Sequence, residues 1–292
     1  TSNTTGANNT FLGGSAGNQI INRNDNTFVG YRAGATNRAG TQSTIIGSHA
    51  GYQPVGAQYS GSANLFAGYG AGHYTGGDNV VALGAYAGYY TTGSKNTFVG
   101  YQAGTGGTTS APFSSGTHNV ALGYQALKGF TTGNDNVAIG SAAGDAITSG
   151  YRNVTIGRYA GSAINTGVSN IILGYAAGDA ITDTTNTVLI GEDAGGAINS
   201  TDANGTVAIG YQAGLSITSG QESVLVGYLA GHKNTTGDYN TVVGYKALGG
   251  DQTGNLTGNS NTAVGRHAMS NAYDAATKNT SMGNQSLESL TN

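Results

Sequence analysis

A glycine-anchored repeat of about 17 residues runs through almost the whole chain, and this repeat most constrains what the chain can fold into. Sixteen copies occur, and eight of the fifteen spacings between successive anchor glycines equal 17. A fixed period of this length is typical of stacked coils rather than of an ordinary globular domain. The anchors are Gly13, Gly30, Gly47, Gly68, Gly84, Gly100, Gly123, Gly140, Gly157, Gly174, Gly191, Gly210, Gly227, Gly244, Gly265 and Gly283.

The residues around each anchor keep strict columns, which we number from the anchor glycine as position 0. Position −3 is β-branched in fifteen copies, −1 is apolar in all sixteen, +3 is alanine in fifteen and +4 is glycine in twelve. Residues 136–144 (NVAIGSAAG) are a representative copy. Short β-branched runs separated by Thr-, Asn-, Gly- and Asp-rich segments predict strands and turns.

We therefore predict an all-β fold, a parallel β-roll or β-solenoid of about sixteen coils with a period near 17 residues. Each coil has room for two strands of about five residues and two turns. The glycine and alanine columns allow backbones to approach closely at a tight corner. We expect a single elongated repeat domain over residues 1–292, with coils from about 9 to 287 and with 288–292 leading into a stalk or a next domain.

Both faces of the repeated strand are apolar. Positions −3 and −1 share one face, and −2 points the other way, yet −2 is also mostly apolar, as at Phe28, Ile45 and Leu189. A strand that is apolar on both faces must be covered on both, so the pattern predicts side-by-side association of several copies. The row at −3 begins with threonines at Thr10, Thr27, Thr44 and Thr97 and is mostly valine from Val120 onward, and we expect it to face inward.

Composition excludes several classes of protein. Glycine is 52 of 292 residues but there are only two prolines, which excludes collagen. The net charge is −3 with 9% charged residues, so a basic nucleic-acid binder is excluded and no nucleic-acid partner is expected. No cysteine is present, hence no disulfide framework. No run of about 18 apolar residues occurs, and we expect no membrane contact by this segment.

Several copies resemble the head repeats of trimeric autotransporter adhesins. Residues 26–30 (NTFVG), 136–140 (NVAIG) and 153–157 (NVTIG) are each followed by two variable residues and an alanine. The resemblance covers about Asn9 to Leu287 and implies a left-handed parallel β-roll in which three chains form a homotrimer. The repeats are also similar to those of phage tail-fibre shafts and other bacterial trimeric fibres. The departures are a longer period, alanine in place of serine at +3, and no neck motif.

Motifs for catalysis and metal binding are weak. Residues 13–17 (GGSAG) match the G-x-S-x-G pattern of hydrolases, but no strand-to-helix context follows. The five histidines have no metal-ligand spacing. Acidic residues before the strands are interpreted as turn residues that cap their own backbone rather than as calcium ligands; they are Asp25, Asp78, Asp135 and Asp238. We expect no catalytic residue, no metal and no cofactor.

Tyrosine follows the anchor in eight copies, and this row is our first candidate for receptor contact. Such a row can contact a partner, since tyrosine offers a large amphipathic area, or it can simply cover the coil. Its members are Tyr31, Tyr69, Tyr101, Tyr124, Tyr175, Tyr211, Tyr228 and Tyr245. Three long spacings predict loops at about 52–62, 105–118 and 249–260, which makes Tyr59 and Phe113 further candidates.

Together these features lead us to expect a non-catalytic extracellular segment of a trimeric adhesin, a rigid shaft or head at the cell surface. Its partners would be two further copies and a host-surface glycan or protein. The first alternative is a tail fibre of a phage or contractile injection system. The second is an ice-binding or carbohydrate-binding solenoid. A carbohydrate-active enzyme is the third, and it would need carboxylates clustered on one face.

Overall fold

The computed structural model describes residues 5–36, 40–53, 61–110, 113–249, 255–272 and 275–290. The chain divides into two compact units, residues 1–149 and residues 150–292, and each is described by itself. The described residues form β-strands, turns and one short 3₁₀ helix, η1 (Thr201–Ala203). The prediction of one elongated domain over 1–292 stays a prediction.

Each repeat copy contributes one three-residue strand at positions −3 to −1. The strands of the first unit are β1 (Thr10–Leu12), β2 (Thr27–Val29), β3 (Thr44–Ile46), β4 (Leu65–Ala67), β5 (Val81–Leu83), β6 (Thr97–Val99), β7 (Val120–Leu122) and β8 (Val137–Ile139). Those of the second unit are β9 (Val154–Ile156), β10 (Ile171–Leu173), β11 (Val188–Ile190), β12 (Val207–Ile209), β13 (Val224–Val226), β14 (Thr241–Val243), β15 (Thr262–Val264) and β17 (Thr280–Met282). The second unit also holds β16 (Asn271–Ala272) and β18 (Ser289–Leu290), which pair with each other.

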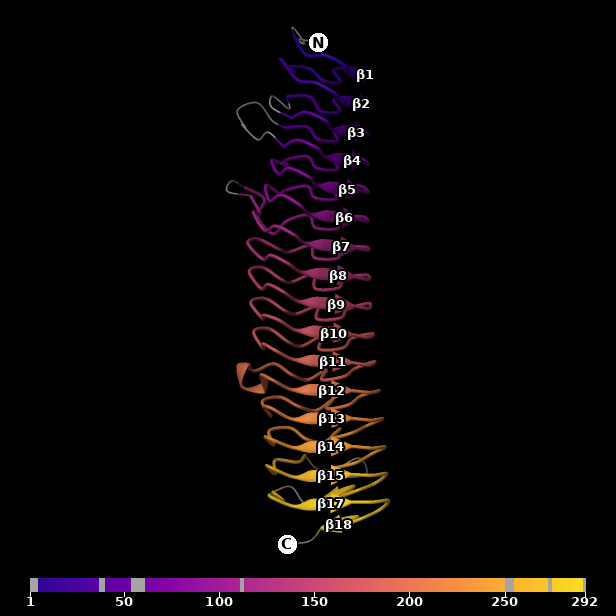
Figure 1. The fold of residues 1–292 in the computed structure, drawn as a ribbon, viewed down its shortest axis with the longest axis vertical. Coiled ribbons are helices and arrows are strands. Elements are labelled where there is room, and N and C mark those ends of the chain that lie inside the picture. The colour runs from indigo at the N-terminus through magenta and orange to yellow at the C-terminus, as the bar shows by residue number, and fades with distance from the viewer. Residues whose placement is uncertain are drawn as a thin grey trace. The chain divides into compact units, whose positions relative to one another are not determined.

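Within each unit the repeat strands pair in parallel and in chain order (Figure 1). The register joins equal positions of successive copies: Val120 lies opposite Val137, and Leu122 lies opposite Ile139. A parallel ladder in which every neighbour is the next copy along the chain is a β-solenoid. The all-β parallel solenoid with a period near 17 residues is therefore confirmed.

The second half of the coil differs from the expectation of two strands. Positions +2 and +4 have left-handed backbone in every copy, as at Arg32 (φ 55°) and Gly34 (φ 57°). Left-handed residues turn the chain instead of extending it, so a row of turns replaces the second strand. Its amides still bond between coils, since Arg32 N donates to the Gly14 carbonyl at 2.9 Å.

The anchor glycines form the corner that follows each strand. Gly123 has φ +137°, and a Cβ placed on it would lie 2.5 Å from the carbonyl oxygen of the next anchor, Gly140. The same clash recurs along the column: a Cβ on Gly191 would lie 2.3 Å from the Gly210 oxygen. Both the dihedral angle and the missing space require glycine here. The predicted close approach of backbones at this corner is confirmed.

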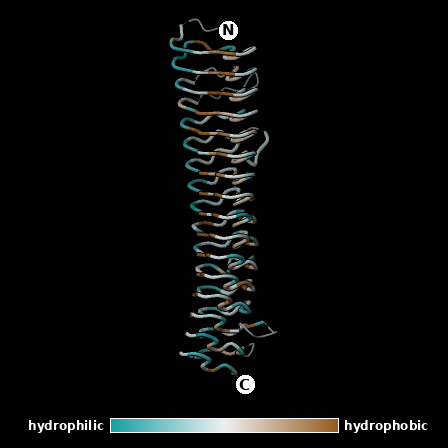
Figure 2. The backbone as a smooth tube through the Cα atoms, turned by 90° about the vertical axis from the view of Figure 1, so that its right-hand side faces the viewer, coloured by the Kyte–Doolittle hydropathy of each residue, from teal (hydrophilic) through white to brown (hydrophobic). Residues whose placement is uncertain are grey.

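The core of each coil is a thin layer built from four columns. Buried side chains come from −2, from the alanines at +3 and from +7, for example Leu189, Ala177 and Ile181. The fourth column, at −4, is mostly asparagine, such as the buried Asn170. Figure 2 shows hydrophobic segments along the strands and hydrophilic ones along one edge of the coils in each unit.

The asparagine column is a ladder of hydrogen bonds that the sequence analysis did not single out. Asn170 Nδ2 donates to Asn153 Oδ1 at 3.0 Å and to the Thr184 carbonyl at 2.8 Å. Asn170 Oδ1 accepts from the backbone N–H of Thr187 at 3.0 Å and from its hydroxyl at 2.7 Å. Each amide thus links two neighbouring coils and satisfies buried polar groups that would otherwise lack partners.

Candidate functional site

The outer face of the strands is apolar and solvent-accessible. Because −2 points into the core, −3 and −1 point away from it. In β8, for example, half-buried Val137 and Ile139 flank the buried Ala138. The exposed fraction is 44% at Ile46, 41% at Leu122 and 42% at Ile171, and it is higher at Leu12 (65%) and Met282 (70%). Each unit therefore carries two adjacent rows of Val, Ile, Leu and Thr side chains that its own chain leaves uncovered.

The orientation of the −3 row corrects one expectation. This row was expected to face inward, but Thr10 and Thr27 are exposed and Thr44 is half-buried on the outer face. The inward residue is the one at −2, such as Phe28, which is fully buried. The pattern alone could not decide, because both faces of the strand are apolar. The outward row contains seven threonines: Thr10, Thr27, Thr44, Thr97, Thr241, Thr262 and Thr280.

All eight tyrosines predicted at +1 lie on the surface, with exposed fractions from 38% at Tyr211 to 52% at Tyr124. Where copies follow one another, the rings stack: Tyr228 lies 5.1 Å from Tyr211 and 5.2 Å from Tyr245, with interplanar angles of 13° and 8°. Stacked rings cover each other's faces and present edges and hydroxyl groups to solvent. The stacked members of the row accordingly offer little ring face to a ligand, whereas Tyr31, Tyr69 and Tyr175 make edge-to-face contacts instead.

A denser aromatic cluster lies in the first unit. We use the name aromatic cluster for His49, Tyr52, Tyr69, His73, Tyr74, Tyr86, Tyr89, Tyr90 and Phe113, whose rings are joined by contacts between 4.5 and 6.0 Å. The predicted loop residue Phe113 belongs to it, since its ring lies 4.8 Å from that of Tyr74. The other loop candidate, Tyr59, lies outside the described residues.

Burial shifts two pKa values in the aromatic cluster. His73 is 8% exposed and stacks on Tyr89 at 4.5 Å and 17°. Loss of solvent lowers the pKa of His73 to about 4, with a smaller contribution from His49. Burial together with the neighbouring phenols, Tyr90 foremost, raises the pKa of Tyr89 to about 12. Both rings are therefore neutral at physiological pH.

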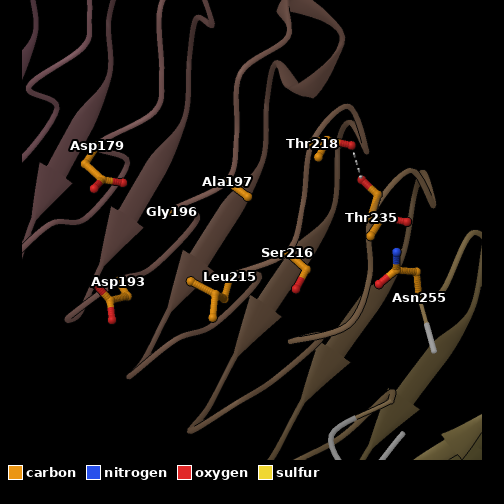
Figure 3. Close-up of a pocket in the computed structure, with 9 residues that line it drawn as sticks. All are labelled: Asp179, Asp193, Gly196, Ala197, Leu215, Ser216, Thr218, Thr235 and Asn255. Carbon is orange, nitrogen blue, oxygen red and sulfur yellow. Dashed lines mark hydrogen bonds between the residues drawn. The ribbon is translucent and has the colours of Figure 1, made fainter. Parts of the chain in front are cut away.

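The second unit carries an open groove that sequence reasoning missed (Figure 3). Its volume is about 560 Å³, and its lining includes Asp179, Asp193, Gly196, Ala197, Leu215, Ser216, Thr218, Thr235 and Asn255. Its two carboxylates, Asp179 and Asp193, come from neighbouring coils. Burial raises the pKa of Asp179, and the like charge of Asp193 adds to this increase. The signal that could have revealed the groove is the glycine at +5, Gly196, between Asp179 and Leu215 in the same row.

The two carboxylates of the groove have different surroundings. Gln212 Nε2 donates to Asp193 Oδ2 at 3.2 Å, so Asp193 already has a partner in the next coil. A Cβ placed on Gly196 would lie 3.6 Å from Asp179 Oδ1, which locates that carboxylate beside the missing side chain. The arrangement can accept hydrogen bonds from a polar ligand. Within the described residues, no group of three or more His, Asp or Glu side chains could hold a metal ion.

The acidic residues before the strands bond across coils. Asp78 Oδ1 accepts from the backbone N–H of Ser62 at 2.7 Å, and Asp238 Oδ1 accepts from that of Gln221 at 3.0 Å. They cap a neighbouring coil rather than their own backbone. Asp25 Oδ1 accepts from Asn8 Nδ2 at 2.9 Å in the same manner. These carboxylates therefore serve the stacking of the coils.

In comparisons with known proteins, no family model and no curated protein matches the chain. The described residues include no apolar helix of the length that a membrane span requires.

Proposed function

We propose that this protein is a non-catalytic structural segment of an extracellular fibre, in which three copies associate through the outer faces of their strands. The observation that carries the proposal is the pair of apolar rows at −3 and −1. No charged side chain occurs at either position in any of the sixteen copies. Contiguous apolar surface of this kind marks interaction sites, because leaving it in water is unfavourable.

Identical copies are the natural cover for this face. The rows repeat with the coil spacing, so a second copy of the same chain matches them row by row, whereas an unrelated partner would need the same period. Closed symmetric association also avoids open-ended growth. The choice of three copies rests on the resemblance to trimeric adhesin heads. On this proposal the segment is a stiff element at a cell surface or on a phage tail, and it presents a host-binding surface through its turn side.

The orientation of the threonines favours a second candidate, an ice-binding solenoid. Seven of the sixteen residues at −3 are threonine, and this position lies on the outer face of the strands. The neighbouring −1 row is aliphatic throughout, however, and nine residues at −3 are Val, Ile or Leu. Such a face suits burial against protein better than hydrogen bonding to a water lattice.

The experiment is the solution mass of the chain by light scattering on a size-exclusion column. We expect about three times 29.1 kDa. In a variant with Val99, Leu122 and Ile139 all changed to Glu, nine added charges in the assembly should dissociate it to single chains. The matched control changes Ser115, Thr132 and Ser149, three exposed turn residues, to Glu. It adds the same charge on another side of the coil and should keep the wild-type mass.

Other masses would decide between the candidates. A folded wild-type monomer overturns association, and thermal hysteresis in that monomer would favour the ice-binding candidate. A stable dimer overturns the trimer while leaving the strand face as the interface. A control variant that dissociates as far as the strand variant would show that added charge, and not the location of the charge, breaks the assembly.

A further inference from the structure

We propose that a small pocket in the aromatic cluster binds one neutral pyranose ring of a glycan. Its lining includes Tyr86, Tyr89, Tyr90, Gln102 and Thr105, and its volume is about 220 Å³. This inference deepens the proposed function, because it names the ligand class that the fibre would present a site for. The pocket residues occupy positions +2, +5 and +6 of the coil, and none occupies the outer strand positions −3 and −1.

Two tyrosine rings form the corner of the pocket. The rings of Tyr89 and Tyr90 lie 4.6 Å apart at 80°, so they are nearly perpendicular walls. Stacking holds each ring in place: Tyr89 lies against His73 at 4.5 Å and 17°. Tyr90 lies against Tyr74 at 5.2 Å and 21° and against Phe113 at 5.8 Å and 27°. Rings held in this way need no reordering when a ligand arrives, which reduces the cost of binding.

Aromatic walls suit the C–H faces of a sugar. A pyranose has an apolar face of axial C–H groups and a rim of hydroxyl groups, and aromatic rings offer a matching flat, electron-rich surface. Tyr228 of the tyrosine row lacks this property, since it stacks on both Tyr211 and Tyr245. The copy anchored at Gly84 is the one copy in the sequence with tyrosine at +2, +5 and +6, namely Tyr86, Tyr89 and Tyr90.

Two polar side chains can meet the hydroxyl rim. Gln102 Oε1 accepts from Gln125 Nε2 at 2.7 Å, which orients the amide of Gln102 and leaves its own Nε2 to donate. The hydroxyl of Thr105 donates to the backbone carbonyl of Gln102 at 2.8 Å. Its Oγ1 can therefore still accept a hydrogen bond from a ligand. One donor and one acceptor at the edge of aromatic walls complement a neighbouring pair of sugar hydroxyls.

Charge and size narrow the ligand class. None of the five lining residues carries a charge at physiological pH, so the pocket offers no ionic partner for an anionic or cationic sugar. A volume of 220 Å³ is below the roughly 300–1,000 Å³ of sites for drug-sized ligands. A single neutral ring at the end or in a branch of a glycan is the ligand that fits both limits.

The test is saturation-transfer NMR on the full chain with three probes: methyl β-D-galactopyranoside, methyl β-D-glucopyranoside and methyl α-D-mannopyranoside. We expect transfer to the ring C–H protons of at least one probe, with affinity in the millimolar range. The Tyr90→Ala variant should weaken binding at least about tenfold, and Gln102→Ala about fivefold. The matched control, Tyr228→Ala, removes a ring from the stacked row and should bind like the wild type. Circular dichroism of each variant verifies the fold.

Three results would overturn the pocket. The first is no transfer to any of the three glycosides. The second is equal loss in Tyr228→Ala and Tyr90→Ala, which would mean adventitious contact with tyrosines in general. The third is binding of a proline-rich decapeptide at the same rings while the sugars fail to bind. The mass measurement separates this inference from the proposed function: a trimer that binds no sugar refutes the pocket alone, and a monomer that binds sugar refutes the assembly alone.

Discussion

The two units share their inner columns and differ in the side chains that they carry at position +5 of the coil. In the first unit this position holds the ring residues Tyr52, His73 and Tyr89, which build the aromatic cluster. In the second unit it holds Asp179 and Gly196, which help to line the open groove. The anchor glycines, the alanines at +3 and the left-handed residues at +2 and +4 are common to both units. The difference teaches that the repeat keeps the backbone constant while the side chains at a surface position such as +5 are free to vary.

The core also varies within this constant backbone. A small residue at −2 is combined with a large one at +7, or the reverse. The copy anchored at Gly123 has Ala121 at −2 and Phe130 at +7, whereas the preceding copy has Phe98 at −2 and Gly107 at +7. The rings of Phe98 and Phe130 lie 5.6 Å apart. The core of a coil can be filled by a large side chain from either column, so its packing density is kept without a change in the backbone. The anchor glycines and the alanines at +3, not the large hydrophobic residues, are therefore the constant part of the fold.

The largest effect is expected from an anchor glycine, and it should be the same in both units. Alanine at Gly123 or Gly191 would put a Cβ 2.5 or 2.3 Å from the next anchor's carbonyl oxygen at a left-handed φ. We expect each variant to lose more than about 3 kcal/mol of stability, measured by urea unfolding followed by circular dichroism. Gly14→Ala is the control, because its Cβ would meet nothing closer than 3.4 Å; its stability should stay within about 1 kcal/mol.

Unequal losses would break the comparison. If Gly123→Ala cost several kcal/mol and Gly191→Ala cost nothing, the second unit would tolerate a displaced corner, and the shared backbone would not be a common requirement. A large loss in Gly14→Ala would instead show that any added methyl group in the turn side is harmful.

A smaller loss is expected when one asparagine of the buried ladder is removed. Asn170→Ala in the second unit leaves the N–H and hydroxyl of Thr187 and the carbonyl of Thr184 without their present partner. In the first unit, Asn119→Ala likewise deprives the N–H of Asn136 and the carbonyl of Gly133. We expect about 2–4 kcal/mol for each in the same urea assay.

Asn199→Ala, which changes an exposed asparagine, serves as the control for the ladder and should change stability by less than about 0.5 kcal/mol. Full stability in Asn170→Ala would mean that water or a shifted neighbour takes over the bonds of the amide, and the ladder would then not be a requirement that the two units share.

How far the sequence could predict the fold depended on whether a residue has one physical role or several. The period, the strand at −3 to −1 and the close glycine corner were predictable, because Gly123 and its counterparts have no other reason to recur. The sequence could not predict which face of the strand points into the core, because Phe28 at −2 and Val29 at −1 are both apolar. The second strand was wrongly expected, since residues as different as Arg32, Tyr86 and Gln102 adopt left-handed backbone at +2.

The residues of the candidate sites could likewise be predicted only in part. Phe113 was predicted as a contact residue from its long spacing, and it lies in the aromatic cluster. The partners that give the pocket its geometry, Tyr89 and Gln102, occupy different repeat positions, +5 and +2, so the repeat alignment alone could not show that their side chains meet across coils. The groove of Asp179 and Asp193 was missed for this reason too: the two residues occupy different repeat positions and meet only when successive coils stack.

The smallest effect is expected from acid, and it should act on the aromatic cluster of the first unit. His73 has a pKa of about 4 in the folded chain against 6.5 when unfolded. The unfolded chain therefore binds the proton first, and the stability that His73 contributes is present above pH 6.5 and is lost as the pH falls toward 4. We expect a loss of about 1–2 kcal/mol over this window, since solvent partly screens the ring.

Urea unfolding at a series of pH values measures this loss, and the NMR titration of the His73 ring protons measures the pKa directly. His73→Gln should flatten the dependence between pH 6.5 and 4, whereas His118→Gln, at an exposed histidine, should leave it unchanged. In the second unit the raised pKa of Asp179 acts with the opposite sign, because protonation favours its folded form as the pH falls. If the His73 ring titrated near pH 6.5, water would have access to it, and the stacking of His73 on Tyr89 would not be the buried contact described above.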